Sequence, residues 1–109
     1  MNTQINYLYR DASNYKVYNE CVIEGEITDE QIMTIIGCLE DGEYFIPEQV
    51  GLDANRFSDF TDDDHCLMEL CKQDFSHTDK KPTVNLNCEQ LVRNFEDAKG
   101  NWNYLIFAY

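Results

Sequence analysis

Basic residues are scarce in this chain of 109 residues. Eight lysine and arginine residues stand against 21 aspartate and glutamate residues, which gives a formal net charge of −13 at pH 7. Direct binding to nucleic acid is disfavoured, because phosphate contacts need a basic patch that so few cations do not supply. Binding to an anionic membrane surface is disfavoured for the same reason. We therefore expect a protein partner with a basic surface, including proteins that themselves bind nucleic acid.

The chain also lacks the motifs that mark common enzymes and metal sites. It has no glycine-rich phosphate loop, no Gly-x-Ser-x-Gly elbow and no His-Glu-x-x-His pair. Asp64, His65, Cys66 and His77 do not have the paired spacing of zinc ligands. We expect no catalytic residue, no metal and no cofactor. A small metal-dependent enzyme that uses His65 and nearby acids is the alternative.

The five cysteines form no Cys-x-x-Cys pair, and an odd number argues against a disulfide framework. They are Cys21, Cys38, Cys66, Cys71 and Cys88. No basic region followed by an apolar run opens the sequence, and no apolar stretch approaches the ~20 residues of a membrane span. These features predict free thiols, no signal peptide and a cytoplasmic location.

The composition predicts a folded chain despite its charge. Hydrophobic residues make up 43% and aromatic residues 13% of the sequence, which is too rich for a disordered acidic segment. The length fits one domain with one modest core. There are no internal repeats and no low-complexity segments, so we expect a single domain over residues 1–109.

Alternation of apolar and polar residues predicts a β-hairpin at the start of the chain. Residues 5–10 alternate, and residues 15–27 are rich in tyrosine, valine and isoleucine. Between them, residues 11–14 supply aspartate, serine and asparagine, which favour turns. Two strands separated by a short turn predict an antiparallel pair.

A helix is predicted directly after the hairpin. Thr28 and Gln31 have the spacing of a capping box, and Gly42 is placed to end the helix. Gly37 lies inside it and suggests close packing on the sheet. The expected apolar stripe consists of Ile32, Ile35, Ile36 and Leu39.

The second half of the chain predicts short strands, a loop and one further helix. The expected segments are an extended stretch at 44–47, a loop at 50–64, a strand at 66–73, a break at 76–82, a helix from Asn87 to Gly100 and a strand at 102–107. The whole pattern predicts an α+β fold, a mostly antiparallel sheet with two helices packed on one face.

Acidic residues are most concentrated in the predicted loop. In an extended chain, Asp62 and Asp64 would lie ~7 Å apart on one side, a spacing similar to that of a phosphate backbone. Calcium binding is a rival, but the loop lacks the glycine and the final glutamate of an EF-hand. A solvated loop with no partner is the other alternative. The candidate partner-binding residues are Asp53, Asp59, Asp62, Asp63 and Asp64.

Three stretches resemble a family of small bacterial and prophage-borne proteins whose activity is largely uncharacterised. They are Tyr9-Arg10-Asp11-Ala12-Ser13-Asn14-Tyr15-Lys16, Tyr44-Phe45-Ile46-Pro47-Glu48-Gln49-Val50-Gly51-Leu52, and Asp64-His65 with Glu69. Family members often carry a Trp-His pair after the Asp-His, where this chain has Leu67-Met68. The resemblance implies kinship of fold and a bacterial setting, and it implies no activity.

By size and acidity the chain is also similar in type to the small inhibitors that mobile elements direct against defence nucleases, anti-CRISPR proteins included. We therefore expect a non-catalytic acidic protein, a nucleic-acid mimic that docks on a basic, nucleic-acid-binding surface of a bacterial defence nuclease. A housekeeping protein-interaction domain, whose charge confers only solubility, is the alternative.

Neutralising the acids of the loop tests this hypothesis. Changing Asp59, Asp62, Asp63 and Asp64 to asparagine should weaken binding to RNA-guided effectors while leaving the fold intact. Association of the wild type should slow as salt rises, because attraction between exposed charges is screened beyond ~8 Å at physiological ionic strength. Pull-down over a salt series measures both effects. Binding that responds to neither change would remove the loop from the mechanism.

Overall fold

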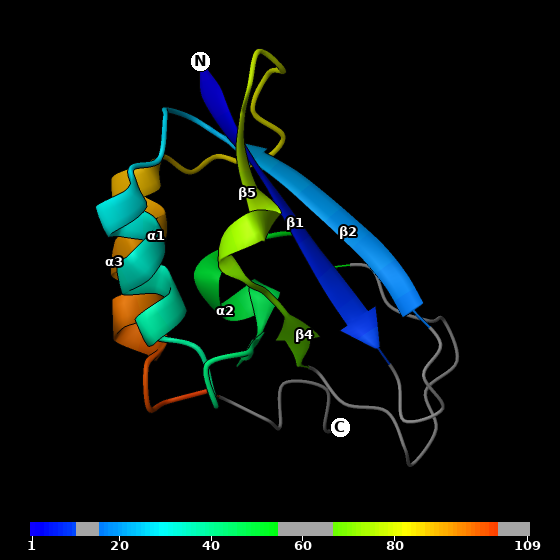
Figure 1. Ribbon diagram of the computed structural model, residues 1–109, viewed down its shortest axis with the longest axis vertical. Helices are drawn as coiled ribbons and strands as arrows, with labels where there is room; N and C mark the ends of the chain where they lie inside the picture. Colours follow the sequence, from blue (N-terminus) through cyan, green and yellow to red (C-terminus); the bar gives the residue numbers. More distant parts are fainter. Residues whose placement is uncertain (11–15, 55–66, 103–109) are drawn as a thin grey trace.

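The strand β1 (Asn2–Arg10) lies at the centre of the structure and pairs with three other strands. The computed structural model describes residues 1–10, 16–54 and 67–102. Along the outer side of β1 runs β2 (Lys16–Ile23), antiparallel and in register from Thr3 opposite Ile23 to Arg10 opposite Lys16. The predicted hairpin partners are therefore confirmed, and Figure 1 shows them as the two longest strands.

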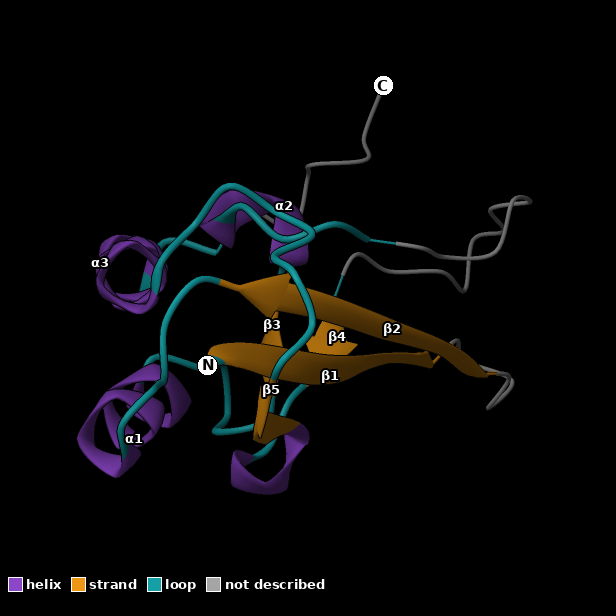
Figure 2. Cartoon of the chain, turned by 90° about the horizontal axis from the view of Figure 1, so that it is seen from above, coloured by secondary structure: helices purple, strands orange, loops and turns teal. Residues whose placement is uncertain are grey.

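Short strands complete an antiparallel sheet of five strands. The remaining strands are β3 (Tyr44–Phe45), β4 (Met68–Glu69) and β5 (Phe75–Thr78). The main order is β2-β1-β4-β3, and β5 pairs with the first part of β1. Two longer helices, α1 (Asp29–Gly37) and α3 (Cys88–Ala98), lie side by side next to the sheet (Figures 1 and 2). The predicted α+β fold class is confirmed.

One face of β1 faces the core. Ile5, Tyr7 and Tyr9 are buried, as the alternation of side chains in a strand requires. The core continues from β1 to the helices through aromatic contacts, since the ring of Tyr7 lies 5.6 Å from that of Phe45. Phe45 in turn lies 5.5 Å from Phe95 of α3. This packing fixes which face of the sheet is covered and which is left open.

Both predicted helix starts are confirmed. Thr28 and Asn87 each cap a helix through a complete capping box, with Gln31 and Gln90 respectively. The end of α1 was predicted too late, because the helix stops at Gly37, well before Gly42.

The apolar stripe of α1 is mostly buried as predicted, even though its last member lies beyond the helix. Ile32, Ile35 and Leu39 are buried, and Ile36 is half-buried. The prediction of close packing at Gly37 was wrong, because an added Cβ there would meet nothing within 4 Å.

The segment from 66 to 82 was predicted incorrectly. One strand was expected over 66–73, but the chain forms the two-residue strand β4 and then a 3₁₀ turn, η1 (Lys72–Asp74). The side chain of Asp74 caps this turn by accepting a hydrogen bond from the amide of Cys71. The expected break at 76–82 instead begins with β5, whose polar residues are held in a strand by pairing with β1. Residues 11–14 and most of the predicted strand 102–107 lie outside the described residues.

A short helix, α2 (Pro47–Val50), was not predicted. Proline fits the first turn of a helix, because the N–H that it lacks would have no partner there. Gly51 ends the helix in the left-handed conformation, with φ 86°.

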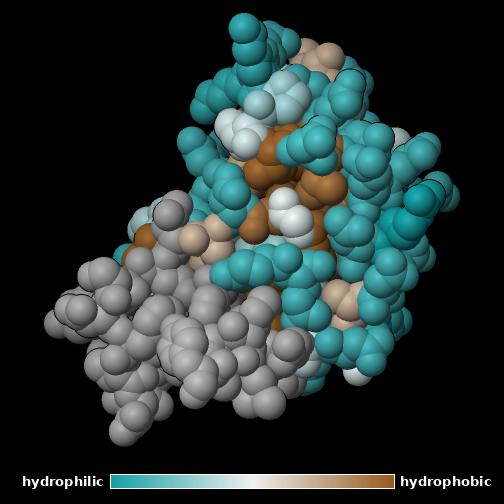
Figure 3. Space-filling model, turned by 180° about the vertical axis from the view of Figure 1, so that it is seen from behind, coloured by the Kyte–Doolittle hydropathy of each residue, from teal (hydrophilic) through white to brown (hydrophobic). Residues whose placement is uncertain are grey.

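No helix in the described ranges is both long and apolar enough to cross a bilayer. Seen from behind (Figure 3), hydrophobic residues gather in the middle of the described part of the face, and most of the residues around them are hydrophilic.

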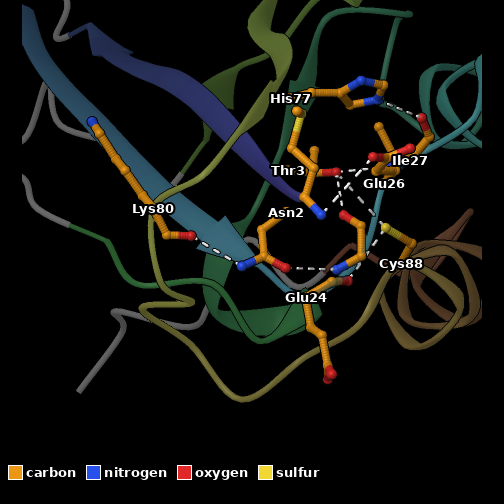
Figure 4. Close-up of polar contacts among 10 residues, drawn as sticks. Asn2, Thr3, Glu24, Glu26, Ile27, His77, Lys80 and Cys88 are labelled. Atoms are coloured by element: carbon orange, nitrogen blue, oxygen red, sulfur yellow. Dashed lines mark hydrogen bonds and ion pairs between the residues drawn. The ribbon is translucent and has the colours of Figure 1, made fainter.

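A buried hydroxyl ties the start of β1 to the connection between β2 and α1 (Figure 4). Thr3 Oγ1 donates to the carbonyl of Gly25 at 2.7 Å and accepts from the amide of Ile27 at 2.9 Å. The side chain of Asn2 accepts from the amide of Gly25 at 3.1 Å. The carbonyl of Ile27 also lies 3.1 Å from His77 Nε2 on β5. These bonds hold the connection against the sheet and so position α1.

Replacing Thr3 with valine should lower the free energy of unfolding by about 1–3 kcal/mol, because the buried amide of Ile27 loses its acceptor. The control is Thr3→Ser, which keeps the hydroxyl and should recover most of this loss. Denaturant unfolding of both variants measures the difference. A valine variant as stable as the serine variant would show that the hydroxyl is not needed.

Candidate functional site

The open face of the sheet carries a hollow of about 700 Å³. Its floor is formed by alternate residues of the hairpin, Asn6 and Leu8 on β1 with Tyr18 and Glu20 on β2. The register places Asn6 opposite Glu20 and Leu8 opposite Tyr18, and cross-strand partners project on the same face. The volume is within the range of ligand-binding pockets. We call this feature the acidic hollow.

Four carboxylates line the acidic hollow. They come from β2, from the segment before β3, from β4 and from the turn η1, namely Glu20, Glu43, Glu69 and Asp74. A guanidinium also lies near it, since Arg10 Nε lies 3.0 Å from an oxygen of Glu69. The hollow therefore has an excess of negative charge, above a floor that includes the apolar side chain of Leu8 and the ring of Tyr18.

The electrostatic effect of these carboxylates is seen at Tyr44. Tyr44 pairs with Glu69 across β3 and β4, so its side chain lies on the same face as the hollow. The pKa of the Tyr44 phenol is raised, first by the negative charge of Glu43, then by burial and by Glu69. The phenolate is disfavoured here because a second negative charge would be added to an acidic site. A cation would be favoured for the same reason.

Tyr18 is the most exposed large hydrophobic side chain among the described residues, at 76%. An exposed aromatic ring beside carboxylates is a favourable surface for an ammonium or guanidinium group, because the ring face attracts cations. Leu8, which is half-buried, adds apolar surface against which the methylene groups of a lysine or arginine can pack. The hollow thus has the chemistry to bind a long basic side chain.

A reactive centre is not evident in the described residues. Partial desolvation and a hydrogen bond with Asp74 raise the pKa of the Cys71 thiol, which disfavours the nucleophilic thiolate. His77 contacts the carbonyl of Ile27 through Nε2. The described residues contain no group of three or more acids, histidines or cysteines able to hold a metal ion. The carboxylates of the acidic hollow are therefore spread around it and do not converge on one point.

The cysteines in the described part of the chain are free thiols. Cys21, Cys38 and Cys88 are buried and Cys71 is exposed. Burial raises the pKa of the thiols of Cys38 and Cys88. Cys66 lies outside the described residues.

Of the sequence-predicted site residues, only Asp53 is described. Its side chain is exposed, it does not line the hollow, and its backbone carbonyl accepts a hydrogen bond from the buried hydroxyl of Tyr7. Asp59, Asp62, Asp63, Asp64 and His65 lie outside the described residues. The acids of the hollow were not identified from the sequence; the available signal was the alternation of residues 5–10, which predicted a strand.

Comparison with known proteins gives no relative, since no protein-family model, curated protein or solved structure matches the chain.

The negative potential of the hollow can be measured at Tyr44. Replacing Glu43 with glutamine should lower the pKa of Tyr44 toward the ordinary value of 10.0, because the largest cause of its rise is removed. Asp41→Asn is the control, since Asp41 contributes least and its left-handed φ of 53° suits asparagine. Carbon-13 NMR titration of the tyrosine rings, assigned with Tyr44→Phe, measures both. Equal effects of the two substitutions would contradict the assigned cause.

Proposed function

We propose that this protein is a non-catalytic binding protein that docks its acidic surface on a basic, nucleic-acid-binding surface of a partner protein. The observation that carries the proposal is the acidic hollow, in which Glu20, Glu43, Glu69 and Asp74 share the lining with Leu8 and the ring of Tyr18. Lysine and arginine side chains of a partner are the groups that fit this lining, because they combine a charged end with an apolar stem.

A protein partner fits the charge distribution better than a metal ion or a small anion. The carboxylates line the hollow from several elements without converging on one point, so they suit several basic side chains spread over a surface. An anionic ligand would be repelled by the lining and by the net charge of −13. Binding would be steered over a distance by the charge and fixed at contact by Tyr18 and the apolar floor.

A partner that handles nucleic acid is favoured, because such proteins present grooves lined with lysine and arginine. An acidic protein that occupies such a groove excludes the nucleic acid and so inhibits the partner. In this proposal the chain acts as an inhibitor of a bacterial defence nuclease, of the anti-CRISPR type, in the cytoplasm. Its support is the charge, the hollow and the resemblance in size and acidity to such inhibitors.

The experiment compares two double variants that remove the same charge from different places. Glu20→Gln with Glu43→Gln acts at the hollow, where neither carboxylate forms an ion pair within the described residues. Glu96→Gln with Asp97→Asn removes two exposed charges on α3. The probes are purified, guide-free RNA-guided nucleases, and the readouts are affinity over a salt series and protection from DNA cleavage.

The hollow variant should bind about tenfold more weakly at low salt, a loss of about 1.4 kcal/mol, and the α3 variant should bind nearly as the wild type does. Equal weakening by both variants would show that only total charge matters and that the hollow is not the docking site. A wild type that binds no nuclease in the panel would overturn the proposed function.

A further inference from the structure

The described residues cover the outer edge of β2 only in part. Among the strands they form, β2 is the last of the sheet and pairs with β1 alone. At one end, Thr83 covers the edge, since its amide donates to the carbonyl of Val22 at 2.8 Å and its Oγ1 accepts from the amide of Val22 at 2.9 Å. The amide of Glu24 likewise donates to the carbonyl of Leu86 at 2.9 Å. The chain itself thus shows that this edge accepts an added segment.

The described residues leave the rest of this edge open. Since the amide and carbonyl of Val22 point away from β1, those of Glu20 and Tyr18 point the same way, because the direction alternates along an antiparallel strand. Within the described residues, no group pairs with the backbone of Tyr18 or Glu20 on this side. Such a row of free donors and acceptors is a template for another strand.

The open edge borders the acidic hollow. Tyr18 and Glu20 line the hollow with their side chains and carry the outward backbone groups of the edge. A strand added beside β2 would therefore place every second side chain on the face of the hollow, next to Glu20 and Tyr18. Basic residues at those positions would face the carboxylates, whereas a second copy of this chain would bring two charges of −13 together.

We propose that an extended, lysine- or arginine-bearing segment of the partner adds as a strand to the outer edge of β2 over residues 16–21. Its backbone pairs with Tyr18 and Glu20, and its basic side chains reach into the acidic hollow. The proposal rests on the proposed function and specifies how the basic partner is bound. Backbone pairing supplies affinity for any extended segment, and the carboxylates select the basic ones.

The test uses a peptide in which lysine alternates with valine, and a second peptide of the same sequence with N-methyl groups on the amides that would pair. Both carry the same charge, but only the first can add as a strand. On titration into nitrogen-15-labelled protein, the unmodified peptide should shift the amide signals of Tyr18 and Glu20. It should also slow their hydrogen exchange by about tenfold or more, as pairing of an open edge requires. The methylated peptide should do neither.

A protein variant checks the edge independently of charge. Tyr18→Pro removes one outward N–H without removing a hydrogen bond to β1. Edge strands tolerate proline at positions whose N–H points outward, as it does here. Tyr18→Val removes the ring and keeps the N–H, and is the matched control. The valine variant should bind the peptide more weakly than the wild type, because it lacks the ring, and the proline variant, which lacks both the ring and the N–H, should not bind it. The circular dichroism spectra of the two variants, which should agree, establish that both are folded.

The outcomes separate this proposal from the proposed function. If both peptides bind equally well, and both bind more weakly to the double variant Glu20→Gln with Glu43→Gln, strand addition is overturned. That result would still support the acidic docking surface. Failure of both peptides to bind would also overturn strand addition, and the nuclease assay alone would then decide the proposed function. Slow exchange at Tyr18 and Glu20 without peptide would show the edge already occupied, by a second copy if the solution mass is doubled and by another part of the same chain if it is not. Either result overturns the proposal.

Discussion

The pairing of β1 with three other strands is the interaction on which the rest of this structure depends. Both edges of β1 are used, by β2 on one side and by β4 and β5 on the other. Its odd-numbered residues then face the core, and Asn6 and Leu8 on its other face line the hollow. Since no other described strand pairs with β2, it is the outer strand on its side of the sheet. The core and the acidic hollow thus have one common cause.

The charge of the chain acts within this arrangement. With a net charge of −13, the acids repel one another, and most of them need contact with water. Several of them line the one open face of a small sheet, where four carboxylates surround the hollow. The raised pKa of Tyr44 reports the resulting potential at the rim. A basic partner would lower this repulsion when it binds, so the same charges that strain the free protein favour the complex.

Local patterns predicted the hairpin, both helix caps and the fold class, because each of these depends on residues close together in the sequence. Thr28 with Gln31 and Asn87 with Gln90 are pairs of this kind. The hollow could not be predicted in the same way. It depends on Glu69 lying opposite Leu8, which is a contact between segments far apart in the sequence. Because β4 is only two residues long, its sequence shows no periodicity from which this pairing could be predicted. β5 was missed for the same reason. The segment is a strand because it pairs with β1, and not because of the propensity of its polar residues.

The most direct test of the central claim is zero-length carbodiimide coupling of the protein to a bound basic partner, because this chemistry joins a carboxylate only to a lysine amine that touches it. Mass spectrometry of the coupled peptides then identifies the carboxylates at the interface. The account predicts that Glu20 and Glu43 carry the links. Links found at Glu96 and Asp97 on α3, with none at the hollow, would contradict it.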